Sequence, residues 1–164
     1  MGDDSVNRKS NRQLKIIGLV LILTVLLISI VLFQSASPMR KAKKQGIKIS
    51  REIANIETVD DFYWFTREKT YFTVVGKDAS DTEKIVFIPQ DGTEAVVMNA
   101  DKGIESSEAV QKVLDLKETK KIKKVSLGLY DKKPVWEVVA DSIDQGIKYY
   151  LIDFNQGEIV NTIS

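Results

Sequence analysis

The longest apolar stretch of the chain lies near its N-terminus. From Ile16 to Phe33, eighteen residues run without a charged side chain, and no charge appears before Arg40. A helix needs roughly 20 apolar residues to cross a bilayer core, whereas the apolar region of a cleaved signal peptide spans only roughly 7–15 residues. The pattern therefore predicts an uncleaved transmembrane signal anchor over residues 16–37, preceded by a tail over residues 1–15.

Basic residues flank the predicted anchor on both sides. Four Lys and Arg residues precede it and six follow closely, and this count alone favours a cytoplasmic C-terminal side. However, a short basic tail directly before the first apolar residues is typical of signal anchors, and long C-terminal domains translocate largely regardless of charge. We therefore expect a single-pass protein of the cell membrane with a cytoplasmic N-terminus and an extracytoplasmic C-terminal domain.

A helical pattern begins after Pro38, which suits the first turn of a helix. Apolar or small residues then recur at spacings of three and four: Met39, Ala42, Gly46, Ile49, Ile53 and Ile56. The first half of this stripe has little apolar bulk, so we expect a stalk there and tertiary packing from Ile49 onward. The lysines and arginines elsewhere on this helix fit two roles equally well, binding to anionic lipid headgroups or a solvated surface.

Strand patterns dominate the rest of the chain. Short β-branched and aromatic runs cover residues 62–65, 70–75, 85–88 and 95–98, and later residues 125–130, 135–140, 149–154 and 158–160. Asp91–Gly92 favours a tight hairpin. Ser106 and Ser107 predict the capped start of a second helix between the two groups of strands.

The two groups of strands repeat each other. Residues 69–76 match residues 133–140 at an offset of 64, and residues 85–96 match the later chain at an offset of 65. Each repeat is then a helix followed by four strands, and the helix covers the apolar face of its antiparallel sheet. The fold class predicted is α+β, with a first unit over residues 38–103 and a second over residues 104–164.

Missing residue types limit the possible chemistry. The chain contains no Cys and no His, which excludes disulfides, thiol nucleophiles, thiolate or imidazole metal sites and a Ser-His-Asp relay. It has neither a glycine-rich phosphate loop nor a calcium-loop pattern. We therefore nominate no catalytic, cofactor-binding or metal-ligating residue, and expect no enzyme activity and no small-molecule substrate. The lack of Cys is compatible with the outer face of a Gram-positive-type cell.

Charge and aromatic residues are unevenly distributed. The 24 Lys and Arg and 23 Asp and Glu give a net charge of +1, so no chain-wide attraction to nucleic acid is expected. The chain after residue 37 carries a net charge of −1, because four basic and two acidic residues precede it. Twelve of the thirteen aromatic residues lie between Phe62 and Phe154, which places the expected core there.

One aromatic cluster is a candidate docking site: Phe62, Tyr63, Trp64 and Phe65. Alternate residues of a strand face opposite sides, so Phe62 pairs with Trp64, and Tyr63 with Phe65. We expect one pair in the core and the other either exposed or between the two units. An exposed pair would bind a partner, although single apolar residues on a surface are also common.

The second unit resembles a PepSY-type domain. The resemblance is carried by Trp136-Glu137-Val138, the run from Tyr149 to Asp153, and Gly157-Glu158-Ile159, after a helix opened by Ser106-Ser107-Glu108-Ala109. With its N-terminal anchor and its tandem copy, the whole chain resembles the TseB-like family of cell-wall elongation regulators. This resemblance implies two tandem cystatin/PepSY-like units outside the membrane and association with a penicillin-binding transpeptidase.

The first unit departs from this pattern at two positions. It has Phe72 where the second unit has Trp136, and Pro89 is aligned with Phe154. The motifs that carry the resemblance are structural, and none is a catalytic signature.

Two functions are open at this point. The first is a non-enzymatic, membrane-anchored extracytoplasmic regulator of peptidoglycan elongation, acting through the transpeptidase that the resemblance implies. The alternative is a PepSY/cystatin-like inhibitor of an extracytoplasmic peptidase. In that case a hairpin tip, either Asp91–Gly92 or residues 155–157, would enter the peptidase cleft.

Overall fold

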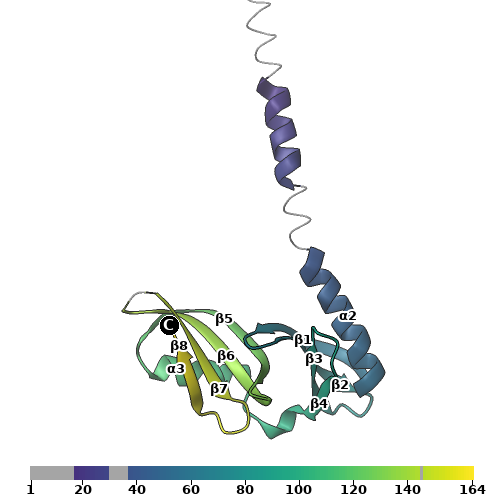
Figure 1. Ribbon diagram of the computed structural model, residues 1–164, viewed down its shortest axis with the longest axis vertical. Coiled ribbons are helices and arrows are strands. Elements are labelled where there is room, and N and C mark those ends of the chain that lie inside the picture. The colour runs from purple at the N-terminus through teal and green to yellow at the C-terminus, as the bar shows by residue number, and fades with distance from the viewer. Residues whose placement is uncertain (1–16, 30–36, 145) are drawn as a thin grey trace, which may run out of the picture. The chain divides into compact units, whose positions relative to one another are not determined.

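The computed structural model describes residues 17–29, 37–144 and 146–164 (Figure 1). The chain divides into two compact units, Met1–Lys41 and Ala42–Ser164, which are described separately. The second unit contains two antiparallel four-stranded sheets, each with a helix packed on one face. The α+β fold class predicted from the repeat is confirmed.

The first unit contains only part of the predicted anchor among its described residues. Residues 17–29 are helical. The predicted ends of the anchor, Ile16 and Phe33, lie outside the described residues, as does the predicted tail over residues 1–15. Within the described ranges, no helix is both long and apolar enough to span a membrane. The anchor over residues 16–37 therefore stays a prediction from the sequence.

Helix α2 (Ser37–Ala54) ends earlier than its apolar spacing predicts. Asn55 follows the helix in the left-handed conformation, with φ 55°, which is a common way for a helix to end. Ile56 then begins strand β1. The expectation that Ile56 extends the apolar stripe of the helix is wrong, because the backbone has already turned.

The face of α2 that packs on the sheet consists mainly of small side chains. Ala42, Ser50 and Ala54 are buried, and the Ser50 Oγ donates a hydrogen bond to the Gly46 carbonyl. Ile53, in contrast, is 46% exposed. Ile49 packs against the core of the first sheet, as predicted. Packing already begins at Ala42, so the expected stalk over the first half of the helix is wrong, because small side chains let the helix approach the sheet closely.

The first sheet contains four consecutive strands, β1 (Ile56–Thr66), β2 (Thr70–Asp78), β3 (Glu83–Pro89) and β4 (Val96–Asn99), in that spatial order. Its side chains alternate between two faces. The face toward α2 carries Phe72, Val74, Val86 and Ile88. The opposite face carries Val75, Ile85 and Phe87, which belong to the core shared with the second repeat.

The second sheet has the same order: β5 (Thr119–Tyr130), β6 (Lys133–Ser142), β7 (Ile147–Asp153) and β8 (Ile159–Ile163). A short 3₁₀ turn, η1 (Ala100–Lys102), and helix α3 (Ser106–Asp115) precede it. Helix α3 buries Ala109 and Val113. Its N-cap position is Glu105, which makes no capping side-chain hydrogen bond. The predicted serine cap is therefore wrong, and Ser106 is already helical.

The central strands of the two sheets repeat at one offset of 64. Phe72 pairs with Ile88 in the first sheet, and Trp136 pairs with Ile152 in the second. The offset of 65 predicted for the third strand is therefore one residue too large. A slip of one residue reverses which side chains of a strand face inward, so Ile85 of the third strand is equivalent to Tyr149 and not to Tyr150. The extra residue lies at the register shift between β7 and β8.

The observed register also corrects one of the two differences between the repeats that the sequence alignment predicts. Pro89 pairs with Tyr71, and Asp153 pairs with Val135, so Pro89 is equivalent to Asp153. The alignment of Pro89 with Phe154 is wrong.

The two repeats meet at β1 and β5, which are equivalent edge strands (Figure 1). Their paired register shifts place β1 and β5 at an offset of 63, which makes Phe65 and Gly128 equivalent positions. Phe65 is fully buried, and a Cβ added at Gly128 would lie 2.1 Å from its Cγ. A glycine at this position therefore makes room for the aromatic ring of the other repeat.

The free edges of these two strands are covered by side chains from the opposite repeat. The Thr73 Oγ1 donates a hydrogen bond of 2.7 Å to the Leu127 carbonyl. The Lys124 Nζ donates one of 2.9 Å to the Trp64 carbonyl. Trp64 and Leu127 are equivalent at the offset of 63, so in both edge strands the same backbone carbonyl accepts a side-chain hydrogen bond from the other repeat. These bonds protect the two edges from pairing with other chains.

Candidate functional site

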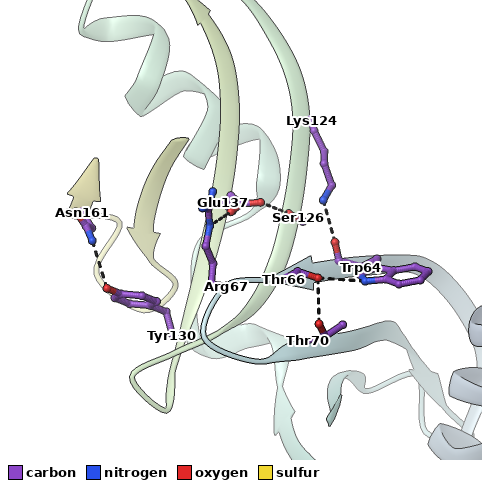
Figure 2. Close-up of polar contacts among 9 residues, drawn as sticks. All are labelled: Trp64, Thr66, Arg67, Thr70, Lys124, Ser126, Tyr130, Glu137 and Asn161. Atoms are coloured by element: carbon purple, nitrogen blue, oxygen red, sulfur yellow. Dashed lines mark hydrogen bonds and ion pairs between the residues drawn. The ribbon is translucent and has the colours of Figure 1, made fainter. Parts of the chain in front are cut away.

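A groove opens where the end of β1 passes over the second sheet, on the face away from α3. We call it the β1–β5 groove. Its volume is about 510 Å³, and its lining residues are Trp64, Thr66, Arg67, Lys124, Glu137, Val139 and Tyr149. Figure 2 shows the polar contacts around it. The first repeat supplies one wall through β1 and the turn after it, and the second repeat supplies the floor through β6 and β7.

The floor of the groove contains a buried carboxylate. Glu137 on β6 is only 3% exposed. Its Oε2 accepts a hydrogen bond of 2.5 Å from the Arg67 Nε, and its Oε1 accepts one of 3.1 Å from the Ser126 Oγ (Figure 2). A buried charge is costly unless it is paired and hydrogen-bonded, and both oxygens of Glu137 meet this requirement.

The Arg67 guanidinium is held on two sides. Besides its pairing with Glu137, its central carbon lies 4.2 Å from the centroid of the Tyr149 ring, a cation–π distance. The Arg67 side chain retains 19% exposure. Within the described part of the chain, no hydrogen bond engages its two Nη nitrogens. The guanidinium is therefore fixed in direction but still has donors for another group.

The second cation of the groove is Lys124. One of its three N–H donors goes to the Trp64 carbonyl, and the residue is otherwise exposed. Trp64 donates its indole Nε1–H to the Thr66 Oγ1 at 3.2 Å, and Thr66 shares a hydrogen bond with Thr70 at 3.3 Å (Figure 2). Two cations and one carboxylate give the groove one net positive charge.

The structure separates the four residues of the predicted docking cluster. Phe62 and Trp64 lie on the face toward α2, where both rings contact Phe72, at centroid distances of 6.2 and 5.1 Å. Tyr63 and Phe65 lie on the opposite face, between the two repeats. Trp64 alone among the four lines the β1–β5 groove. Docking through these residues stays a prediction.

Tyr63 is partly buried where the two repeats meet. Its ring packs edge-on against Trp136 at 5.4 Å. Burial raises the pKa of Tyr63 to about 12, and the nearby Asp61 carboxylate adds to the shift. The hydroxyl is therefore neutral throughout the physiological pH range.

The tips of the two predicted inhibitory hairpins are tight turns. Gly92 and Gly157 both have positive φ, 76° and 70°. In the first turn, the Asp91 Oδ1 accepts hydrogen bonds from the backbone N–H and hydroxyl of Thr93. These bonds, together with the Lys69 ammonium, hold the pKa of Asp91 well below its usual range. In the second turn, Asp153 accepts hydrogen bonds from two backbone N–H groups.

Sequence reasoning missed the main residues of the groove. One signal was available, because Glu137 is the single charged residue in the apolar run from Val135 to Ala140, and a carboxylate within a buried strand needs a partner. Nothing local identifies that partner, since Arg67 lies 70 residues away. In the described ranges, no group of three or more acidic residues could hold a metal ion.

Part of the chain is similar to a known protein family, and most of it is similar to a solved structure. Residues 45–89 match the family model described as the cell wall elongation regulator TseB-like domain, a range that covers the end of α2 and strands β1 to β3. The solved structure of the YpmB protein from Bacillus subtilis matches with a TM-score of 0.67 and 23% identity, covering 74% of this chain and 95% of that one. At this identity the likeness shows the fold alone. No curated protein matches the sequence.

Proposed function

Because residues 45–89 match the model of a cell wall elongation regulator TseB-like domain, we propose that the chain regulates cell-wall elongation by binding a partner protein and performs no chemistry of its own. The observation that carries this proposal is the family match over residues 45–89. The matched range includes β1, which forms one side of the junction and one wall of the β1–β5 groove. The regulatory role is therefore assigned to the part of the chain that also builds this surface.

The proposal includes a location and a partner. Residues 16–37 act as a single membrane anchor, and Ala42–Ser164 lies outside the cytoplasm. The uncharged run from Ile16 to Phe33 supports the anchor. The partner is a penicillin-binding transpeptidase of the elongation machinery, and this choice rests on the family resemblance.

Photo-cross-linking in living cells tests the partner. A cross-linking amino acid is placed at Thr66, an exposed residue of the groove, and in a second strain at Ser80, an exposed residue of the β2–β3 turn. Recovery of a penicillin-binding transpeptidase with the full-length chain supports the proposal. Recovery of only a peptidase would overturn it and favour the inhibitor alternative.

Protease treatment of intact protoplasts tests the location. An extracytoplasmic Ala42–Ser164 is digested from outside, whereas a cytoplasmic one stays intact until the membrane is broken. Protection in intact protoplasts would contradict the proposed topology and, with it, an extracytoplasmic partner.

A further inference from the structure

We propose that the β1–β5 groove is a binding site for the free carboxylate of a peptide, held by Arg67 and Lys124. This goes beyond the proposed regulatory role, because it assigns a ligand class to a particular site and does not depend on the identity of the protein partner. The site combines hydrogen-bond donors that are held in position, a net charge opposite to that of a carboxylate, and apolar walls that can contact the group attached to it.

The buried carboxylate fixes the first donor. Glu137 takes the Nε of Arg67 and Tyr149 supports the guanidinium from below, so the Nη edge has little freedom. A pre-positioned guanidinium is well suited to a carboxylate, because its parallel N–H groups match the two oxygens. Lys124, anchored through the Trp64 carbonyl, supplies a second cation beside the groove.

The charge of the groove favours a carboxylate over a phosphate. Arg67 and Lys124 contribute two positive charges and Glu137 one negative charge, which leaves one positive charge to be balanced. A carboxylate carries one negative charge, whereas a phosphate monoester carries nearly two at neutral pH. A second negative charge would lie close to the buried Glu137 without a cation of its own.

The size and walls of the groove favour a carboxylate attached to a larger group. The volume of about 510 Å³ lies within the range of sites that bind organic ligands, roughly 300–1,000 Å³. Trp64, Val139 and Tyr149 provide apolar surface beside the two cations. The end of a peptide, with a carboxylate next to an aliphatic side chain, satisfies both parts of the lining.

The other repeat shows that the fold does not need this ion pair. Thr73 occupies the position in β2 that Glu137 occupies in β6, at the offset of 64, and it is fully buried with one hydrogen bond. Tyr130 stands where Arg67 would repeat, at the offset of 63. A buried ion pair often contributes no more stability than well-packed neutral residues. The pair in the groove is therefore better explained by a ligand than by folding.

Titration calorimetry on the full-length chain in detergent tests the site. The probes are N-acetyl-alanyl-alanine, the same dipeptide with a C-terminal amide, and inorganic phosphate. We expect the acid to bind at least ~10-fold more tightly than the amide, because a charge-assisted hydrogen bond is lost in the amide. Equal binding of acid and amide, no binding of the acid, or tighter binding of phosphate would overturn the proposal.

Two groove variants and one control complete the test. Lys124→Met and Arg67→Lys are each expected to weaken binding of the acid by ~10-fold or more, while Arg67→Lys keeps a cation beside Glu137. Lys77→Met removes a partly exposed lysine that pairs with Asp81 outside the groove, and should leave binding unchanged. Circular dichroism confirms that each variant is folded. Unchanged binding in a folded Lys124→Met variant would sink the proposal even if Arg67→Lys does not fold.

Discussion

The two repeats share a fold but use the face away from their helix in different ways. In the first sheet this face is covered by the second repeat, and Val75, Ile85 and Phe87 are buried in a common core. In the second sheet the corresponding face is covered by the end of β1, the turn after it and Tyr71 of β2, and the β1–β5 groove stays open beside them. One strand register thus produces a packing face in one copy and an open polar groove in the other.

The positions that differ between the copies explain this contrast. A neutral Thr73 in β2 can be buried with one hydrogen bond to the opposite strand, whereas Glu137 in β6 requires Arg67 and Ser126. The two equivalent faces therefore differ by one buried charge, that of Glu137. This carboxylate needs a second charge, that of Arg67, as its partner.

Other positions keep the same role in both copies. Lys84 of β3 and Lys148 of β7 are equivalent at the offset of 64. Lys84 donates a hydrogen bond to the Ala54 carbonyl at the end of α2, and Lys148 donates one to the side chain of Glu118, beyond the end of α3. In both repeats a lysine of the third strand ties the sheet to the C-terminal end of the helix or to the residues just beyond it.

The largest expected effect comes from breaking the buried ion pair. Arg67→Ala leaves the Glu137 carboxylate buried with Ser126 as its single donor, so we expect a loss of about 3 kcal/mol in the free energy of unfolding. The value is at the lower end of the usual range because Arg67 is partly exposed. Urea unfolding of the full-length chain measures it.

The comparison of the repeats supplies a rescue for this variant. Adding Glu137→Thr introduces the residue that the first repeat has at this position, and removes the unpaired charge. The double variant should recover part of the lost stability. If the double variant is less stable than Arg67→Ala alone, a threonine cannot replace Glu137 in the second repeat as Thr73 does in the first.

The next effect concerns the contact between equivalent edge strands. Gly128→Ala places a Cβ 2.1 Å from the Phe65 Cγ, and overpacking of this kind costs about 1–3 kcal/mol. Adding Phe65→Ala removes Cγ and Cδ1, the two Phe65 atoms nearest to the new methyl group, so the two changes together should cost less than their sum. Additive losses in urea unfolding would contradict a direct clash.

A smaller effect appears at high pH through Tyr63. Its folded pKa of about 12 exceeds the ordinary value of 10.0, so the folded state keeps a proton that the unfolded state releases. Stability is therefore unaffected below pH 10 and falls as the pH rises toward 12. We expect a loss of about 1–2 kcal/mol, reduced because the ring is only partly buried.

Tyr63→Phe removes this titration without removing the ring. Urea unfolding across this pH range should show a weaker loss for the variant than for the parent chain. An equally steep loss in both would show that Tyr63 does not cause it.

The smallest effect distinguishes the β2–β3 turn of the first sheet from the equivalent β6–β7 turn of the second. The Lys84 ammonium, with backbone N–H groups of the turn, holds the pKa of Asp78 below its usual value of 3.8. This stabilisation is present above that value and is lost as the pH falls through the lower folded pKa. Ser142 occupies the equivalent position and accepts a hydrogen bond from the Asp144 N–H.

Thermal unfolding at about pH 6 and about pH 2 checks this difference. Asp78→Asn should lose less of its melting temperature on acidification than the parent chain, because its side chain cannot be protonated. Ser142→Ala should behave like the parent chain in this respect. A parent-like response of Asp78→Asn would assign the acid sensitivity to other carboxylates.

Local sequence predicted the strand repeat well but misjudged where its first strands begin. β1 begins at Ile56 and β5 at Thr119, both earlier than the apolar and aromatic runs predict. Each strand contains two register shifts in its first half, and a bulge interrupts the alternation by which a strand is read from sequence. The apolar and aromatic runs therefore predict only the later part of each strand.

The sequence by itself determined the elements that depend on neighbouring residues. These are the helix and four strands of each repeat, the glycine turns at Gly92 and Gly157, and the alternation that puts Phe72 and Val74 on one face. Only the tertiary structure decided which faces meet. Phe65 lies on Gly128 and Arg67 reaches Glu137 because two edge strands more than 60 residues apart are brought together, and the packing energy that selects this arrangement comes from the whole core and from no single segment.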